Sequence, residues 1–521
     1  MTMLKLSVSL FALATCALGA DLPSIEKKGS KFFFSNGTQF FLKGVGYQQD
    51  SSAAGATTTN STFVDPLADE ARCKEDIPLL AELGTNIIRT YAIDPTADHS
   101  ACMKLLNDAG IYVISDLSEP SLSIDRSDPA WDVELFNHYK AVVDAMAGYS
   151  NVLGFFAGNE VSNQANNTGA SAYVKAAVRD TKKYISDKNY RWMGVGYAAN
   201  DDTDIRDELS AYFNCGDADQ SIDFFGYNIY SWCGSSDFEK SGYNRFIDAF
   251  KDYSVPVFFA EYGCNLPSGA AKRTFDETTA LYSSNMSEVV SGGIVYEYFE
   301  ETNDYGLVKI SSGSATKMAD FAHLQKNVRA ASPAGVKMSA YTSTNKAASC
   351  PTVNSTWAAS SSLPPTPNES ACSCITNSSS CVPADGLASS KYSAVFDYIC
   401  GVNSTLCDPI NGNATTGVYG TFSMCSDVDK LAYVLNAYYE SQGKASTACD
   451  FNGKAQTQKA STTSGDCIKL AASSNTTSSS SSSTSSSVAI VGAPMTHAFT
   501  LGGFGVSLYM AVLVGAGMLA L

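Results

Sequence analysis

The chain has 521 residues, enough for two or three folded domains at roughly 150 residues each. Its formal net charge of −17 argues against a polyanionic partner such as nucleic acid and is compatible with a neutral ligand. The 15 cysteines indicate an oxidising compartment, in which disulfides persist.

The first residues have the pattern of a secretory signal peptide. Lys5 supplies a positive charge, residues 6–18 are apolar, and Gly19 and Ala20 are small residues suited to a cleavage site. The apolar run is too short to cross about 30 Å of hydrocarbon as a membrane helix. We therefore expect residues 1–20 to be a signal peptide and the mature protein to be secreted.

Catalytic machinery is expected in a region where two patterns alternate. Between residues 40 and 299, short β-rich runs alternate with stretches of helical spacing, such as 130–149 and 170–188. The β-rich runs largely lack polar alternation, as do parallel strands that are buried on both faces. The expected strands are 40–47, 86–92, 112–117, 152–159, 192–197, 224–230, 255–262 and 292–299.

Eight such alternations predict an α/β fold of the (β/α)₈ TIM barrel type, within a catalytic domain at 21–350. A doubly wound open sheet is the alternative. It is disfavoured because Gly44-Val45-Gly46 lacks the third glycine and the following helix of a dinucleotide-binding loop. In a barrel of this type the active site lies at the C-terminal ends of the strands.

Beyond residue 331 the composition changes to Ser, Thr, Pro and Ala, which predicts an extended linker at 351–371. The segment 372–467 then holds many cysteines and no histidine, so a small disulfide-rich domain is favoured over a zinc site. Its disulfide pairing stays open, because eight cysteines allow 105 connectivities. The cysteines are Cys372, Cys374, Cys381, Cys400, Cys407, Cys425, Cys449 and Cys467.

The C-terminal end has the composition of a lipid-anchor signal. Residues 473–487 are almost all Ser and Thr, and residues 498–521 are nearly all apolar and carry no charge. A transmembrane helix is the alternative, but no Lys or Arg follows to anchor it. We expect a Ser/Thr-rich segment at 468–492 and a removed glycosylphosphatidylinositol (GPI) attachment signal at 493–521. Such an anchor places the protein at the outer face of the plasma membrane, or in the cell wall.

Two glutamates end apolar strands of the predicted barrel. Glu160 follows Asn159 at the end of the fourth strand, and Glu261 lies at the end of the seventh. A carboxylate at such a position is costly unless it has a partner or a purpose. Retaining glycosidases use two carboxyl groups about 5–5.5 Å apart, one as acid/base and one as nucleophile. We predict that Glu160 and Glu261 form this pair and that Asn159 bonds the sugar 2-hydroxyl.

A structural ion-paired role is the alternative for both glutamates. Other acids, among them Asp116 and Glu297, also lie near strand ends, and Asn368-Glu369 repeats the Asn-Glu dipeptide in the linker region. The four histidines show no metal-ligand spacing, so we expect neither metal nor cofactor. The sequence also lacks a Gly-x-Ser-x-Gly nucleophile elbow and a phosphate-binding loop.

Seven segments together resemble glycoside hydrolase family 72, the fungal GPI-anchored β-1,3-glucanosyltransferases that elongate wall glucan. The resemblance covers nearly the whole chain from Phe32 onward. Its segments are Phe41-Leu-Lys-Gly-Val-Gly-Tyr-Gln48, Arg89-Thr-Tyr91-Ala-Ile, Ala157-Gly-Asn159-Glu160, Gly196-Tyr-Ala-Ala-Asn-Asp201-Asp, Tyr230-Ser-Trp-Cys233-Gly, Phe259-Ala-Glu261-Tyr-Gly-Cys264 and Gly293-Ile-Val-Tyr296.

The resemblance implies a role for each residue of the site. It makes Glu160 the acid/base and Glu261 the nucleophile, as the residues themselves suggest. It further implies contacts to the glucan donor from Tyr91, Asn159 and Tyr296, contacts to the acceptor from Asp201 and Arg206, and lining of the site by Gln48, Asp116 and Tyr230. Tyrosines suit these positions because their rings stack on sugar faces while their hydroxyls bond sugar oxygens.

The same resemblance implies disulfides and a second domain. The implied disulfides of the catalytic part are Cys73–Cys102, Cys233–Cys264 and Cys215–Cys350. The cysteine-rich segment 372–467 resembles the family's mostly helical X8 domain, which is associated with β-1,3-glucan.

The function implied is transfer rather than hydrolysis. The enzyme would cleave inside a β-1,3-glucan, keep the new reducing end as a glycosyl-enzyme, and pass it to the non-reducing end of another β-1,3-glucan chain. A hydrolytic endo-β-1,3-glucanase is the first alternative, because it shares the barrel and the carboxylates. A non-catalytic wall-binding protein is the second.

Overall fold

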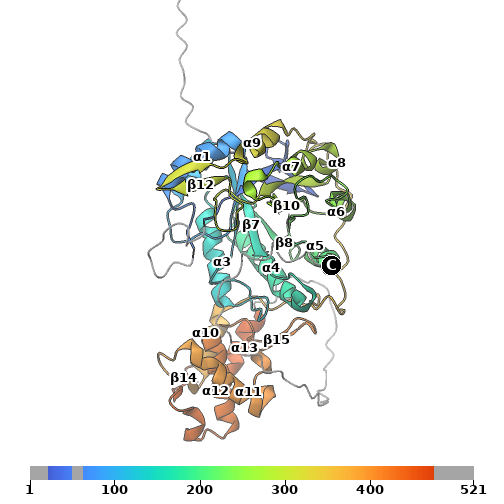
Figure 1. The fold of residues 1–521 in the computed structure, drawn as a ribbon. Helices are drawn as coiled ribbons and strands as arrows, with labels where there is room; N and C mark the ends of the chain where they lie inside the picture. The colour runs from blue at the N-terminus through green and yellow to red at the C-terminus, as the bar shows by residue number, and fades with distance from the viewer. Residues whose placement is uncertain (1–20, 50–62, 474–521) are drawn as a thin grey trace, which may run out of the picture.

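Within residues 21–49 and 63–473, which the computed structural model describes, eight parallel strands close into a barrel. The barrel occupies the upper part of Figure 1, and a smaller domain lies below it. This confirms the predicted fold class. The barrel strands are β4 (Leu42–Gly46), β5 (Ile87–Thr90), β6 (Tyr112–Asp116), β7 (Val152–Asn159), β8 (Gly194–Ala199), β9 (Phe225–Asn228), β10 (Val257–Tyr262) and β11 (Val290–Val295).

Helices follow the strands in turn and cover the outside of the barrel (Figure 1). The helices are α1 (Glu70–Leu83), α2 (Ser100–Asp108), α3 (Val133–Met146), α4 (Ser171–Asp187), α5 (Arg206–Asn214), α6 (Tyr243–Phe250), α7 (Asp276–Leu281), α8 (Ser284–Ser287) and α9 (Phe321–Ala330). Short 3₁₀ helices η1 (Ala165–Ala170) and η2 (Ala270–Lys272) and a hairpin of β12 (Val308–Ser311) and β13 (Ser314–Lys317) occupy loops between them.

Aromatic side chains fill the barrel interior and close the end at which the parallel strands begin. A small antiparallel sheet of β1 (Ile25–Lys28), β2 (Lys31–Phe34) and β3 (Gln39–Phe40) precedes the barrel, and sequence analysis did not anticipate it. Phe32 of this sheet packs 6.1 Å from Phe224, which in turn lies 5.3 Å from Phe156. Gly196 leaves the room that Phe224 needs, because a Cβ at this glycine would come within 2.2 Å of the ring. The interior is therefore a packed core, and polar groups gather at the C-terminal ends of the strands.

The C-terminal domain is small, mainly helical and rich in disulfides, as predicted. Its helices are α10 (Glu369–Ser378), α11 (Tyr392–Val402), α12 (Asp427–Ser441) and α13 (Ser464–Ser473), with η3 (Ser389–Lys391), η4 (Ser404–Leu406), η5 (Asp408–Ile410) and η6 (Ser446–Cys449) between them. Its strands form two short pairs, β14 (Cys381–Pro383) with β17 (Ala455–Thr457) and β15 (Gly412–Asn413) with β16 (Val418–Tyr419).

Both domains contain disulfides, and each disulfide joins two cysteines of the same domain. The barrel contains Cys73–Cys102, Cys233–Cys264 and Cys215–Cys350, the pairs that the family resemblance implies. Of the connectivities that the sequence left open, the C-terminal domain contains Cys372–Cys425, Cys374–Cys467, Cys381–Cys449 and Cys400–Cys407.

The segment expected to be a linker is extended but packs tightly against the barrel. Trp357 is completely buried, its ring lies 5.1 Å from Tyr212 of α5, and its indole donates to the carbonyl of Ala359. Further along, Thr366 donates to buried Asp180 of α4 at 2.7 Å. Composition predicted a spacer because Ser, Thr and Pro dominate it, whereas a single tryptophan is enough to anchor the segment to a core.

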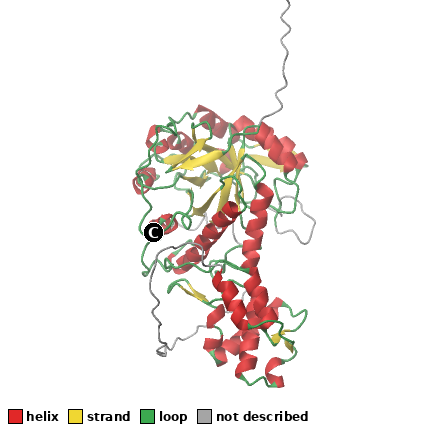
Figure 2. Cartoon of the chain, turned by 180° about the vertical axis from the view of Figure 1, so that it is seen from behind, coloured by secondary structure: helices red, strands yellow, loops and turns green. Residues whose placement is uncertain are grey.

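The two domains also contact each other directly. The backbone N–H of Val133, at the start of α3, donates to the carbonyl of Met424 at 3.0 Å. Tyr419 of β16 packs edge to face on Tyr173 of α4, with ring centres 5.9 Å apart. Figure 2 shows the long helices of the barrel reaching down to the C-terminal domain. The disulfide-rich domain is therefore held against the barrel rather than tethered at a distance.

Several predicted segments fall wholly or partly outside the described residues. These are the signal peptide at 1–20, the GPI signal at 493–521 and the Ser/Thr-rich segment beyond residue 473. Residues 468–473, which were assigned to that segment, belong to α13 instead, and this helix carries Cys467. Among the described residues, no helix combines the length and apolarity needed to cross a membrane.

The burial of Trp357 generates a stability prediction. Trp357→Ala should lower the free energy of unfolding of the barrel by about 3–5 kcal/mol, because it leaves a cavity in the core. The measurement is urea unfolding followed by circular dichroism. Val353→Ala in the same segment is the matched control, since Val353 is 41% exposed, and should change the free energy by less than about 0.5 kcal/mol. Equal effects of the two substitutions would contradict the packed linker.

Candidate active site

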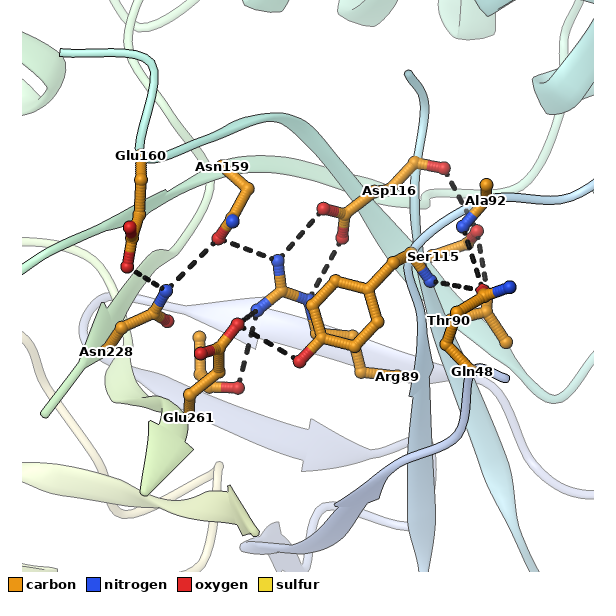
Figure 3. Close-up of polar contacts among 12 residues, drawn as sticks. Gln48, Arg89, Thr90, Ala92, Ser115, Asp116, Asn159, Glu160, Asn228 and Glu261 are labelled. Atoms are coloured by element: carbon orange, nitrogen blue, oxygen red, sulfur yellow. Dashed lines mark hydrogen bonds and ion pairs between the residues drawn. The ribbon is translucent and has the colours of Figure 1, made fainter. Parts of the chain in front are cut away.

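The two glutamates emerge from opposite walls of the barrel mouth. Glu160 follows the last residue of β7. Glu261 lies near the end of β10, three strands further around the barrel from β7. Figure 3 shows both carboxyl groups turned toward the same space at the ends of the strands. The structure thus brings the predicted pair together at the end of the barrel where barrel chemistry occurs.

The backbone at Glu160 adopts an unusual conformation. Its φ angle is +49°, in the left-handed region that residues other than glycine rarely occupy. Two hydrogen bonds hold it there: its N–H donates to the carbonyl of Ala198 at 2.8 Å, and its carbonyl accepts from Arg126 at 2.8 Å. Such local strain persists where surrounding contacts determine the geometry, and it clusters at functional sites. The turn directs the Glu160 side chain across the barrel mouth.

The Glu160 carboxyl group is held by an amide. Asn228, at the end of β9, donates from Nδ2 to Glu160 Oε1 at 2.8 Å and to Asn159 Oδ1 at 3.2 Å. Because Asn159 Oδ1 accepts here, its Nδ2 is the group that can donate to a sugar hydroxyl. The Glu160 side chain is partly exposed, and the Asn228 amide is a hydrogen-bond partner of its carboxyl group.

Arg89 of β5 organises the centre of the site and is completely buried. Its guanidinium forms a two-pronged ion pair with Asp116, at 3.0 and 2.9 Å. The same group donates to Asn159 Oδ1 at 3.0 Å and to Glu261 Oε1 at 3.3 Å. Burial lowers the pKa of Arg89, but the combined effects of Asp116, Tyr91 and Glu261 outweigh burial and raise it, so the guanidinium stays charged. One cation therefore contacts three polar side chains of the site (Figure 3).

Aromatic rings lie on both sides of this cation. The Arg89 guanidinium carbon lies 4.5 Å from the ring centre of Phe156 and 4.2 Å from that of Tyr91. These cation–π contacts fix the plane of the guanidinium and hence the direction of its donors.

Glu261 is surrounded by hydrogen-bond donors. Besides Arg89, the Tyr91 hydroxyl donates to Oε1 at 3.0 Å and the Tyr230 hydroxyl donates to Oε2 at 2.8 Å. The pKa of Glu261 is raised to about 7, because burial and the negative charge of Glu160 outweigh the opposing effects of Arg89 and of the hydrogen bonds from Tyr230 and Tyr91. Ionisation of Glu261 therefore depends on its donors. Their arrangement suits a carboxylate that must be charged to attack an anomeric carbon.

Four tyrosine rings pack together beside Glu261. Tyr296 lies edge to face with Tyr91, Tyr230 and Tyr305, at centroid distances of 6.2, 6.4 and 5.4 Å. Tyr305 also packs on Tyr230 at 5.7 Å. Tyr91, Tyr230 and Tyr296 are the tyrosines that the family resemblance implies for the site, and Tyr305 is an addition from the structure. Together they present the amphipathic surface on which a sugar ring can stack.

Two predicted lining residues make their contacts within the protein. Gln48 accepts from the backbone N–H groups of Tyr91 and Ala92, at 3.0 and 3.1 Å, and donates to the carbonyl of Val64. Asp116 is 3% exposed and its two oxygens bind Arg89. In this structure both side chains support residues of the site, Gln48 through the Tyr91 backbone and Asp116 through Arg89.

Asp201 and Arg206 form a separate group. Arg206 pairs with Asp201 Oδ1 at 3.0 Å, and the Tyr227 hydroxyl donates to the same oxygen at 2.6 Å. Asp201 lies in the loop after β8 and Arg206 at the start of α5, and both side chains are partly exposed. They lie next to the strand ends without joining the Arg89 network, a position compatible with the acceptor contacts that the resemblance implies.

Sequence reasoning assigned no role to Arg89, Asn228 or Tyr305. A signal for Arg89 was present, because a lone arginine within the apolar strand 86–92 must have a buried partner. Asn228 ends an apolar strand as Asn159 does, which is a weaker signal. Tyr305 lies in an irregular loop after β11. Only its contacts with Tyr230 and Tyr296 identify it as part of the site.

No group of three or more His, Cys, Asp or Glu side chains arranged to hold a metal ion occurs in residues 21–49 and 63–473. The groups that this part of the chain offers for chemistry at the barrel mouth are carboxyls, amides, phenols and guanidinium groups.

The dependence of Glu261 on its donors generates a prediction. Tyr230→Phe removes the donor to Oε2 and so raises the pKa of Glu261. Since an ionised Glu261 is required, the acidic limb of the kcat/KM profile should move to higher pH, and activity should fall as the pH is lowered through that pKa. Steady-state kinetics over a range of pH measures this. Tyr305→Phe is the control, because its ring belongs to the same cluster and, among the described residues, its hydroxyl does not bond Glu261. An unshifted limb in Tyr230→Phe would contradict the role given to the hydroxyl.

Comparison with known proteins identifies two family models in the chain. Residues 14–332 match the glycoside hydrolase family 72 model, described as glucanosyltransferase, and residues 379–456 match the X8 domain. The first match spans more than half of the sequence and includes both glutamates and Arg89. The second lies within the disulfide-rich domain.

Curated relatives and solved structures agree with these matches. A 1,3-beta-glucanosyltransferase of Arthroderma benhamiae is 50% identical over 96% of this chain and 94% of its own length. The 1,3-beta-glucanosyltransferase gas1 of Schizosaccharomyces pombe is 46% identical, over 86% and 81%. A mutant of Saccharomyces cerevisiae Gas2p, solved with laminaritetraose and laminaripentaose, is 41% identical and covers 87% of this chain and 99% of its own, with a TM-score of 0.78. The chain therefore belongs to glycoside hydrolase family 72, with an X8 domain attached to its catalytic barrel.

Proposed function

We propose that this protein is a retaining β-1,3-glucanosyltransferase that elongates cell-wall glucan. The observation that carries the proposal is the pair of glutamates at the mouth of one barrel, joined through Asn228, Asn159 and Arg89. Membership of a family of glucanosyltransferases and likeness to an enzyme solved with laminari-oligosaccharides support the choice of β-1,3-glucan. The proposed partners are a glucan donor and a glucan acceptor.

In the first step, Glu160 protonates the glycosidic oxygen while Glu261 attacks the anomeric carbon. The bond to the leaving chain breaks, and the fragment with the original reducing end departs. A covalent glycosyl-enzyme remains on Glu261. Arg89, Tyr91 and Tyr230 hold the Glu261 carboxylate in place before attack. In this proposal Asn159 bonds the sugar 2-hydroxyl.

In the second step, ionised Glu160 takes a proton from the 3-hydroxyl at the non-reducing end of a second glucan. That oxygen attacks the anomeric carbon, and Glu261 leaves as a carboxylate. Two inversions give net retention, so the new linkage is again β-1,3. Binding of an acceptor chain along Asp201 and Arg206 raises the local concentration of sugar hydroxyl over water.

Domain roles complete the proposal. Residues 21–350 form the catalytic domain, 351–371 connect it to the X8-type domain at 372–467, and the latter binds β-1,3-glucan. The chain is exported by its signal peptide and held at the outer face of the plasma membrane by a GPI anchor. Direct contact between the two domains supports a joint action on one polysaccharide.

Azide rescue separates the roles of the two carboxylates. The substrate is a β-laminarioligosaccharide with an aryl leaving group, which needs no protonation. In Glu261→Ala, azide should attack from the vacated face and yield the α-glycosyl azide. In Glu160→Ala, azide should intercept the glycosyl-enzyme and yield the β-glycosyl azide. Product configuration is read by nuclear magnetic resonance, and the opposite pattern would reverse the two assignments.

Product sizing separates transfer from hydrolysis. The enzyme is incubated with one laminarioligosaccharide, and the products are sized by mass spectrometry. Products longer than the substrate are expected, because an acceptor competes with water for the glycosyl-enzyme. Shorter products alone would mean an endo-β-1,3-glucanase.

Glu160→Gln should lower the rate by about 10²–10⁴-fold, as loss of a general acid does. Absence of any turnover in the wild-type protein would instead favour a wall-binding protein.

A further inference from the structure

A third carboxyl group lies beside the tyrosine cluster and has no part in the two-step reaction. Glu297 directly follows Tyr296 and is 4% exposed. Its Oε1 accepts from Asn303 Nδ2 at 2.8 Å, and the same amide nitrogen lies 3.4 Å from the Tyr296 hydroxyl. A buried carboxyl that is hydrogen-bonded to an amide instead of a cation is costly to ionise.

The charged groups around Glu297 do not compensate for that cost. Glu301 of the same loop and Glu261 of β10 both carry like charge toward it. Arg273 donates to the backbone carbonyls of Tyr296 and Tyr305, on either side of Glu297 in the sequence. Its charge is already balanced by buried Asp320, at 2.7 Å.

These surroundings have a consistent effect on protonation. Burial raises the pKa of Glu297 well above its usual range, the Asn303 hydrogen bond opposes this, and the carboxylates of Glu301 and Glu261 raise it further. Tyr296 also affects the group through a hydrogen bond that lowers the pKa. Together these effects favour the neutral form of the Glu297 carboxyl group.

Glu297 is also built into the loop that carries two of the four tyrosines. Its N–H donates to the carbonyl of Tyr305 at 3.1 Å, and its carbonyl accepts from the N–H of Leu307 at 3.1 Å. The Asn303 amide that bonds the Glu297 carboxyl also bonds the Tyr296 hydroxyl. The orientation of the Tyr296 ring and the position of Tyr305 thus depend on the same residue.

We propose that Glu297 is a positioning residue for glucan binding that acts in its neutral form, holding Tyr296 and the loop of Tyr305 against the other tyrosines. When it ionises at alkaline pH, a second negative charge lies beside Glu261. Hydration of this charge requires water to enter between Glu297 and Asn303, which displaces Tyr296 and weakens glucan binding. The inference rests on the proposed sugar-binding role of Tyr296, and not on the roles of Glu160 and Glu261 in bond cleavage.

The test measures binding without turnover. Laminaripentaose is titrated calorimetrically into the full-length Glu160→Gln variant between about pH 5 and about pH 9, with and without Glu297→Gln. In the parent variant, Kd should rise roughly tenfold over the alkaline part of this range. In Glu297→Gln, Kd at acidic pH should stay within about twofold of the parent, because glutamine resembles a neutral carboxyl, and the alkaline weakening should disappear.

Two further variants make the test specific. Glu301→Gln removes a like charge, which lowers the pKa of Glu297, so binding should weaken at a lower pH than in the parent. Glu297→Ala loses the support of Tyr296 and should bind weakly at every pH. Circular dichroism at each pH verifies that every variant is folded.

The outcomes are distinguishable. Alkaline weakening that persists in Glu297→Gln, or binding that is independent of pH in the parent, would overturn the inference while leaving the proposed function intact. Equal weakness of Glu297→Gln and Glu297→Ala at acidic pH would overturn it as well. Absence of laminaripentaose binding by the parent at every pH would contradict the proposed substrate, and the inference with it.

Discussion

The candidate site depends on one buried guanidinium. Arg89 enters the barrel mouth from β5, and its donors reach Asp116 on one side, Asn159 in the centre and Glu261 on the other. A charge buried this deeply is tolerated only when its partners satisfy it, so the same contacts that stabilise Arg89 also fix the groups around it. The interactions that stabilise the buried charge of Arg89 are therefore the ones that position the side chains of the site.

The barrel supplies what this cation requires. Phenylalanines fill the barrel interior next to it, and Phe156 provides a ring face for the guanidinium. Parallel strands bring β5, β6, β7 and β10 to one rim, where residues far apart in sequence meet. The two glutamates reach this rim in different environments. Glu261 is buried among donors, while Glu160 is partly exposed and held by an amide. Different environments allow two identical side chains to perform different tasks.

The second domain is joined to the barrel by packing as well as by chain connection. Trp357 belongs to the core beneath α5, and Thr366 bonds Asp180 of α4, so the connecting segment has little freedom. The Cys215–Cys350 disulfide attaches the start of this segment to the barrel. A fixed separation supports the proposed joint action of the two domains on one polysaccharide, because their relative position then needs no further ordering on binding.

Much of the architecture could be predicted from local patterns. Apolar runs at regular spacing identified all the barrel strands, with ends displaced by a few residues, because burial on both faces removes polar alternation from a strand. Cysteine density identified the disulfide-rich domain. The antiparallel strands β1–β3 and the packed linker were missed, since short or proline-rich segments carry little periodicity and their burial depends on partners elsewhere.

Sequence by itself determined which carboxylates stand at strand ends, and the family resemblance supplied their expected roles. It could not show that Gln48 and Asp116 support other residues, that Arg89 connects both sides of the mouth, or that Glu297, within the described part of the chain, is bonded by an amide and forms no ion pair. These features arise from contacts between residues that are 27 to 172 positions apart, or from the absence of such contacts around a buried group. Only the closed barrel decides them, because closure sets which strand ends face one another and which charges lose their water.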